Sequence, residues 1–344
     1  MNYNPMRNLP ADAGYRQGDV LVLCGELFGR GYANGIVEQA RRKGMTIIGT
    51  TVGRRESDGA LRPLNADELA ASEELLGGKI INIPLEAGFD MEPAANGTTP
   101  LDQLKGAKPD DWSTLKLDWH AIEEARCAGT KRLKANLASV SAELEKLVPA
   151  GANLLMVHTM AGGIPRARLF MPLLNRVFKG QGDKYLASED FWGSDLGKLC
   201  DWSFNEVTAD SLAYLIAETA SLREKVSCGG GRVSYAAYGY HGCEVLVNGS
   251  YCWQSYTPYL QGWAKMRLES QAAAAWEKGI KATVYNCPEI QTNSSALFLG
   301  VEISLYPLLT ALEKEGGAVA AEVGSACKAL LADGATIEAM LHRA

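Results

Sequence analysis

The sequence predicts an α/β fold with a doubly wound, mostly parallel sheet and helices on both faces. Short runs of apolar residues, rich in valine, leucine and isoleucine, recur along the chain. Helical patterns separate these runs, and a glycine-rich turn follows the first of them. Strands that are apolar throughout are typical of a parallel sheet covered on both faces, and alternation with helices is typical of the α/β class.

The first strand–helix–strand unit lies near the N-terminus. Its strands are expected at residues 19–24 and 45–50, and its helix ends before Gly44. A unit of this length makes the right-handed crossover that is repeated in Rossmann-type folds.

Further strands and helices continue the alternation. The other strands are expected at residues 79–83, 153–158, 232–237 and 280–285. Helices are expected at residues 119–147, 209–225 and 258–278, the last with Thr257 as N-cap and Pro258 at its first position. Residues 53–75 and 86–118 are polar and contain proline, so they are expected to be irregular surface segments.

A single Rossmann-like domain is expected over residues 1–344. Residues 19–160 are expected to form its nucleotide-binding half, and residues 205–344 are expected to form its second half with a helical C-terminus. Between them, residues 162–204 combine large apolar side chains with arginines and lysines. This composition suits a helical insertion that covers a substrate cleft, although an ordinary hydrophobic subdomain with a solvated basic face would show it too.

The composition excludes several classes of protein. The 344 residues include 34 basic and 40 acidic ones, and the net charge of −6 would repel nucleic acid. A membrane span and a secretory signal are not predicted, so a cytoplasmic location is expected. The eight cysteines and four histidines are scattered, so we expect reduced thiols and no metal site.

A glycine-rich turn, Gly25-x-x-x-Gly29-Arg30-Gly31, follows the first strand. Such a turn lets the backbone approach a pyrophosphate and directs helix N-terminal amides toward it, so a nucleotide site is expected here. The alternative is a tight turn that only lets a helix pack closely on the sheet.

The end of the second strand bears on cofactor choice. An acidic residue there would hold the ribose 2′-hydroxyl of NAD, but this chain has Gly53 followed by Arg54 and Arg55. Two arginines suit a 2′-phosphate, so NADPH is expected, with NADH as the other possibility. Alternatively, the arginines only solvate a loop.

Tyrosine and lysine residues follow the fifth strand. Tyr240 comes first, and then Tyr256 and Tyr259 precede Lys265, with eight and five residues between. A lysine near a nicotinamide can favour the phenolate of a tyrosine and bind ribose hydroxyls, while the phenol donates to a substrate oxygen.

These motifs resemble the short-chain dehydrogenase/reductase superfamily, and within it the divergent trans-2-enoyl-CoA and enoyl-acyl-carrier-protein reductases with a Tyr-x8-Lys motif. The resemblance extends over most of residues 19–315. It is carried by the glycine turn, His158-Thr-Met-Ala161-Gly-Gly-Ile-Pro165-Arg166, Tyr238-Gly-Tyr240-His-Gly242, Tyr256 through Lys265, and Thr292-Asn-Ser-Ser-Ala296.

The resemblance implies an enzyme of fatty acid metabolism that reduces an enoyl thioester with NAD(P)H. Tyr256 would stabilise the enolate, Tyr240 would be a second donor, and Lys265 would hold the ribose. It also implies a homo-oligomer formed near residues 211–225. Together with the residues already discussed, it gives an expected cofactor site of Gly25, Gly29, Arg30, Gly31, Arg54, Arg55, His158, Ala161, Lys265, Pro288 and Thr292.

Two other functions remain open from the sequence. A carbonyl reductase or alcohol dehydrogenase would use the same tyrosine and lysine, but its usual serine is missing, because Ser234 lies too early in its strand. A regulator could bind NADP without turnover, but it would need neither Tyr256 nor Lys265. His158, which ends an apolar strand, is expected to be a core or cofactor-contacting histidine rather than a metal ligand.

Overall fold

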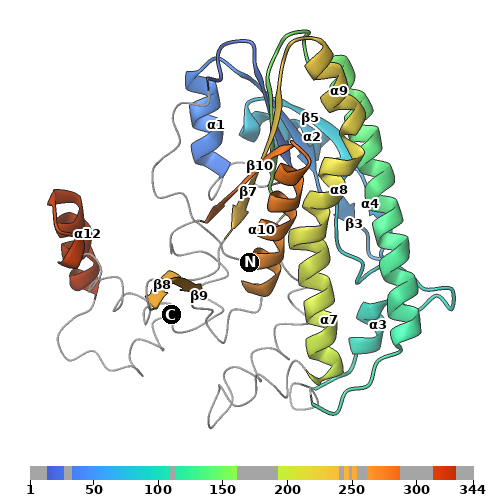
Figure 1. Ribbon diagram of the computed structural model, residues 1–344. Coiled ribbons are helices and arrows are strands. Elements are labelled where there is room, and N and C mark those ends of the chain that lie inside the picture. Colours follow the sequence, from blue (N-terminus) through green and yellow to red (C-terminus); the bar gives the residue numbers. More distant parts are fainter. Residues whose placement is uncertain are drawn as a thin grey trace. The chain divides into compact units, whose positions relative to one another are not determined.

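The computed structural model describes residues 14–26, 33–108, 113–160, 193–239, 244–247, 250–253, 262–286 and 313–330 (Figure 1). The chain forms two compact units. The larger comprises Pro10–Gly239 and Trp263–Asn286, and the smaller comprises Met1–Leu9, Tyr240–Gly262 and Cys287–Ala344. The functional division at residues 160 and 205 stays a prediction from the sequence.

The larger unit contains a six-stranded sheet in which every pairing is parallel. Its strands are β1 (Val20–Cys24), β2 (Thr46–Thr51), β5 (Lys79–Pro84), β6 (Leu154–His158), β7 (Val233–Gly239) and β10 (Lys281–Asn286). Their order across the sheet is β10-β7-β6-β1-β2-β5. The chain runs from β1 to one edge and then returns to build the other half, which is the doubly wound order of a Rossmann-type fold. The predicted fold class and all six predicted strands are confirmed.

The two faces of β1 pack into two separate cores. Val20 and Val22 face a core that includes residues of α4, α8 and α10, whereas Leu21 and Leu23 face a core that includes residues of α1 and α2. All four side chains are fully buried. Because successive side chains of a strand point to opposite faces, an unbroken apolar run is what a strand covered on both sides requires.

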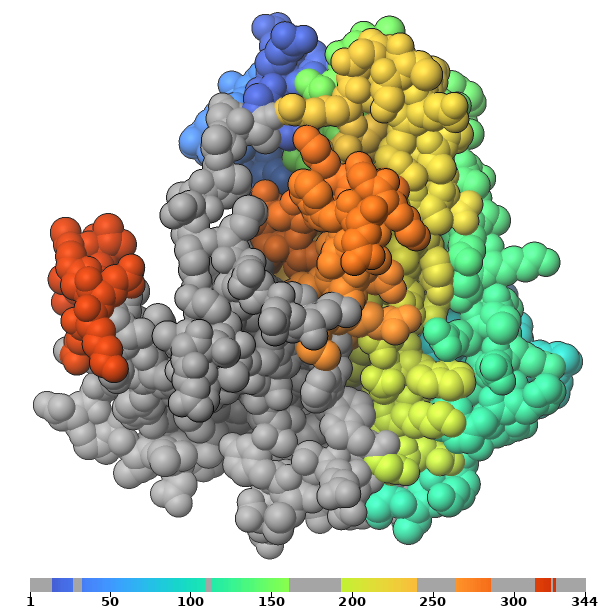
Figure 2. Space-filling view, viewed as in Figure 1, coloured from blue at the N-terminus to red at the C-terminus, as the bar shows by residue number. Residues whose placement is uncertain are grey.

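The helices of the larger unit are α1 (Ala33–Arg42), α2 (Ala66–Leu76), α3 (Pro100–Leu104), α4 (Trp119–Leu147), α7 (Asp195–Phe204), α8 (Ser211–Glu218), α9 (Ala220–Cys228) and α10 (Gly262–Glu277). A π-helical turn, η2 (Asn205–Asp210), joins α7 to α8. The helices α8 and α9 pack along α4. In Figure 2 the yellow atoms of α8 and α9 adjoin the green atoms of α4. The expected helix at residues 119–147 is confirmed, and the one expected at 258–278 is described from Gly262 onward.

The segment expected to be irregular at residues 53–75 is partly regular. It forms a short hairpin of β3 (Arg54–Arg55) and β4 (Leu61–Arg62), followed by α2. A capping box begins this helix, because the Asn65 side chain accepts from the Glu68 amide and the Glu68 side chain accepts from the Asn65 amide. A capping box of Thr99 and Asp102 likewise begins α3 within residues 86–118.

The described part of the smaller unit consists of an antiparallel pair, β8 (Glu244–Val247) with β9 (Ser250–Trp253), and of the helix α12 (Ala318–Leu330). Most of the expected substrate-covering insertion, residues 161–192, lies outside the described residues. No helix in the described ranges is long and apolar enough to cross a bilayer. Nor do the described residues include a group of three or more histidine, cysteine or acidic side chains that could hold a metal ion.

Candidate cofactor site at the carboxyl edge of the sheet

The carboxyl ends of β1 and β6 meet where the strand order reverses. Cys24 and His158 are the last paired residues of these strands. Beyond them, the Thr159 amide donates to the Cys24 carbonyl over 2.8 Å, and the Gly25 amide donates to Thr50 Oγ1 over 2.8 Å. Ligands of open α/β sheets bind in the crevice at this point, so the expected cofactor site begins here.

Gly25 occupies a position that only glycine fits. Its φ is +123°, and a Cβ atom there would lie 2.6 Å from Thr159 Oγ1 and 2.9 Å from the Thr159 carbonyl carbon. The backbone therefore turns tightly against β6 as it leaves β1, as a turn that approaches a pyrophosphate must. Gly29, Arg30 and Gly31 lie outside the described residues, so the rest of the turn stays a prediction.

Lys265 lies near the carboxyl end of β7. Its side chain is buried at 6% exposure, and its Nζ donates to the Tyr238 carbonyl over 2.8 Å. This contact places the ammonium of Lys265, a residue of α10, at the carboxyl end of β7. Lys265 therefore lies at the same edge of the sheet as Gly25 and His158.

His158 is fully buried and neutral at physiological pH. Its Nε2 lies 2.7 Å from Ser211 Oγ, and that hydroxyl donates to the Val207 carbonyl over 2.6 Å. Because Ser211 donates its hydroxyl proton to the Val207 carbonyl, the hydroxyl can only accept from His158, so Nε2 is the protonated nitrogen and Nδ1 is an acceptor. Nδ1 has no hydrogen-bond partner among the described residues. Burial, and secondarily the positive charge of Lys265, lowers the pKa of His158 to about 3.

The guanidinium of Arg54 is held by the carboxylate of Glu26, the residue that follows Gly25 at the end of β1. Its Nη1 and Nη2 donate to Glu26 over 2.9 and 2.7 Å. Glu26 Oε2 also accepts from Thr51 Oγ1 over 2.8 Å and from the Val52 amide over 3.3 Å. Burial alone would raise the pKa of Glu26, but hydrogen bonds from Arg54 and Thr51 outweigh it, so this pKa is lowered and the group is ionised.

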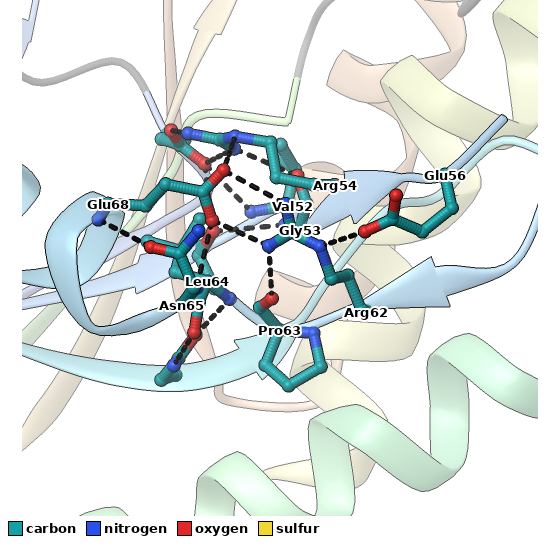
Figure 3. Close-up of polar contacts among 12 residues, drawn as sticks. Val52, Gly53, Arg54, Glu56, Arg62, Pro63, Leu64, Asn65 and Glu68 are labelled. Carbon is teal, nitrogen blue, oxygen red and sulfur yellow. Dashed lines mark hydrogen bonds and ion pairs between the residues drawn. The ribbon is translucent and has the colours of Figure 1, made fainter.

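Figure 3 shows that Arg54 lies beside a second ion-pair group. In that group Arg62 contacts Glu56 and donates to Glu68 over 2.5 Å. Glu68 is also 3.9 Å from Arg54 Nε. Carboxylates therefore surround Arg54 on two sides.

Arg55 is an internal ion-pair residue. Its side chain is 9% exposed, and it donates to Glu86 over 2.6 Å and to Glu92 over 2.7 Å. A third donor reaches the Gly59 carbonyl over 2.7 Å. Because carboxylates neutralise both arginines and would repel a phosphate, the structure does not support the expected contacts of Arg54 and Arg55 with a 2′-phosphate.

The structure thus brings Gly25, His158 and Lys265 to one edge of the sheet. The other expected site residues lie outside the described part of the chain and stay predictions: Gly29, Arg30, Gly31, Ala161, Tyr240, Tyr256, Pro288 and Thr292. Glu26 and Ser211 were not predicted from the sequence. An acidic residue directly after Gly25 is visible there, but dinucleotide folds usually carry the ribose-binding acid after the second strand.

The strand order and the tight glycine after β1 define a doubly wound, Rossmann-type fold of the class that binds dinucleotides. The model of the family described as "Enoyl-acyl carrier protein reductase FabMG" matches residues 2–344. The chain belongs to this family. The predicted resemblance and the predicted enoyl reductase activity class are thereby confirmed.

Two solved FabMG structures agree with this assignment. An apo FabMG structure is 52% identical, with a TM-score of 0.85 over 100% of this chain and 78% of that chain. A FabMG structure with bound NADH is 45% identical, with a TM-score of 0.67 over 92% and 72% of the two chains. The Bacillus cereus enoyl-acyl carrier protein reductase with NADP⁺ and indole naphthyridinone is 16% identical, with a TM-score of 0.45 over 93% of each chain. No curated protein matches significantly. The expectation of a nicotinamide cofactor is confirmed for the family, since one solved member contains NADH.

Proposed function

We propose that this chain reduces the carbon–carbon double bond of an enoyl thioester carried by acyl carrier protein, with NADH as its reductant. The observation that carries the proposal is the buried ammonium of Lys265, held at the carboxyl end of β7 on the same sheet edge as Gly25. Membership of the FabMG family supplies the reaction class, and a relative that contains NADH supports the cofactor.

The residues at this edge fit a dinucleotide. Gly25 leaves room for a close approach of the backbone, and the Nδ1 acceptor of His158 lies at the end of the adjacent strand. When bound, the cofactor supplies a hydride for the β-carbon of the substrate. Lys265 would bind the hydroxyls of the nicotinamide ribose, because its ammonium is a donor that α10 and the Tyr238 carbonyl hold in place.

The remaining chemistry is assigned to tyrosines. As the double bond is reduced, negative charge develops on the thioester oxygen, and Tyr256 would stabilise it by donating a hydrogen bond. The ammonium of Lys265 would lower the pKa of this phenol, and Tyr240 would be a second donor. These two roles rest on the Tyr-x8-Lys motif. A homo-oligomeric state and a cytoplasmic location also stay predictions from the sequence.

The test measures NADH oxidation by the purified chain with crotonyl-acyl carrier protein, crotonyl-CoA and a simple ketone. We expect turnover with the enoyl thioesters only. Lys265→Met should lower NADH affinity and turnover, by about 10²-fold in rate. Lys278→Met is the matched control, because Lys278 is an exposed lysine just beyond the same helix. Reduction of the ketone alone, or a Lys265→Met variant as active as wild type, would refute the proposal.

A further inference from the structure

We propose that Glu26 makes the site select NADH over NADPH, and that Arg54 is its positioning residue. The inference rests on the proposed function, since it concerns the adenosine ribose of the same cofactor. It assigns a specificity role to a residue of the first strand's turn, whereas dinucleotide folds usually carry this acid after the second strand.

Position 53 cannot hold a carboxylate in this chain. Gly53 directly follows Val52 at the end of β2 and has a φ of +81°. A Cβ atom there would lie 2.7 Å from the Arg62 carbonyl oxygen and 2.7 Å from Pro84 Cβ. Because any side chain at this position would clash with the β4 backbone, the acid that binds a ribose must come from another element.

Glu26 brings a carboxylate to the same place. It lies two residues beyond β1, yet it accepts hydrogen bonds from the Thr51 hydroxyl and the Val52 amide at the carboxyl end of β2. Its side chain is 17% exposed. The carboxylate is therefore anchored over the end of the second strand, where the ribose 2′-hydroxyl of NAD is expected.

The hydrogen bonds of Glu26 leave room for a hydroxyl. Oε2 accepts from Thr51, Val52 and Arg54, whereas Oε1 has Arg54 Nη2 as its one donor among the described residues. A carboxylate offers about four acceptor positions over its two oxygens, so Oε1 can accept a further hydrogen bond. A ribose hydroxyl supplies such a donor. A 2′-phosphate supplies none and adds negative charge beside an ionised group.

Arg54 explains why Glu26 stays in place and why the arginine does not recruit NADPH. Its two hydrogen bonds to Glu26 fix the plane of the carboxylate, as paired guanidinium and carboxylate groups do. The same hydrogen bonds pair the positive charge of Arg54 with Glu26, so this charge is not available to a 2′-phosphate. Replacing Glu26 by glutamine should therefore remove the repelling charge and leave Arg54 available to a phosphate.

The experiment compares dissociation constants for NADH and NADPH by fluorescence titration, which needs no turnover. We expect wild type to prefer NADH by at least about tenfold, and Glu26→Gln to lose at least about tenfold of that preference, chiefly through tighter NADPH binding. The control, Glu56→Gln, removes the same charge from the neighbouring ion-pair group shown in Figure 3 and should leave the ratio unchanged.

Arg54→Gln is the second variant, and it keeps the proposal testable if Glu26→Gln does not fold. It leaves the Glu26 charge but removes its fixation, so NADH should bind more weakly while NADPH gains nothing. An unchanged cofactor ratio in folded Glu26→Gln, or tighter NADPH binding by Arg54→Gln, would overturn the role of Glu26 alone. Failure of wild type to bind either cofactor would overturn the proposed function as well.

Discussion

Asp210 and Arg267 form an ion pair of 2.7 Å between the π-helical turn η2 and α10. Asp210 is buried, and Gln271 contributes a second donor at 3.4 Å. Arg267 lies two residues beyond Lys265. The pair therefore ties the helix that carries the buried lysine to the long helical segment α7–η2–α8, and so helps to position the Lys265 ammonium at the sheet edge.

Asp210→Asn should loosen this tie without changing the shape of the side chain. Losing a charged hydrogen-bond partner at a buried position costs about 1–3 kcal/mol, so the free energy of unfolding in urea should fall by that amount. NADH affinity should fall with it, because α10 carries Lys265. Glu277→Gln, an exposed change at the end of the same helix, should alter neither quantity. An unaltered NADH affinity in Asp210→Asn would show that the ion pair has no positioning role.

The buried His158 should make the protein less stable in acid. Its folded pKa of about 3 lies below the ordinary value of 6.5, so the unfolded chain binds the extra proton between these limits. Stability is thus complete above pH 6.5 and is lost as pH falls toward 3. Between pH 7 and pH 5 this group alone should cost about 2 kcal/mol.

Urea denaturation at both pH values measures this loss. The folded His158→Gln variant should lose about 2 kcal/mol less than wild type between pH 7 and pH 5. His120→Gln, at an exposed histidine of α4, should behave like wild type. If His158→Gln shows the same loss as wild type, the acid sensitivity comes from other groups.

Gly25→Ala should damage the turn at the end of β1. The added methyl group would meet Thr159 at 2.6 Å, and alanine would be strained at a φ of +123°. Such strain costs about 1–3 kcal/mol, and the displaced backbone should also weaken nucleotide binding. Gly35→Ala is the control, since nothing lies within 4 Å of the added atom and α1 favours alanine. Thermal melting and NADH titration would show the contrast, and equal behaviour of the two variants would contradict a requirement for glycine at position 25.

Tyr256→Phe should slow turnover by about 10²- to 10⁴-fold, the usual cost of losing a positioned proton donor, with little change in NADH affinity. Tyr259→Phe should be nearly silent, because the Tyr-x8-Lys spacing selects Tyr256. Steady-state kinetics on crotonyl-acyl carrier protein distinguish the two. If Tyr259→Phe were slow and Tyr256→Phe remained active, Tyr259 and not Tyr256 would be the donor, and the Tyr-x8-Lys assignment would be wrong.

Local patterns predicted most of the regular structure. The run that became β1 is apolar throughout and the run that became β6 is apolar up to its last residue, His158, which is typical of strands buried on both faces. The long helix α4 also began where predicted, after Asp118, whose side chain accepts from the Ala121 amide. The helix α2 was not predicted, because its surroundings are polar and contain proline; the capping box of Asn65 and Glu68 is the local signal that marks its start.

The sequence by itself determined the doubly wound sheet, the tight glycine Gly25 after its first strand and the place of Lys265 after its fifth, because these follow from periodicity and short spacings. What Arg54 and Arg55 do was decided only by the tertiary structure. The carboxylates that accept their hydrogen bonds are Glu26, Glu86 and Glu92, which lie 28, 31 and 37 residues away in the chain. A charge is free or neutralised according to its neighbours in space, and contacts over such separations leave no local pattern. Folding therefore turned two arginines that suggested a phosphate site into the partners of three carboxylates.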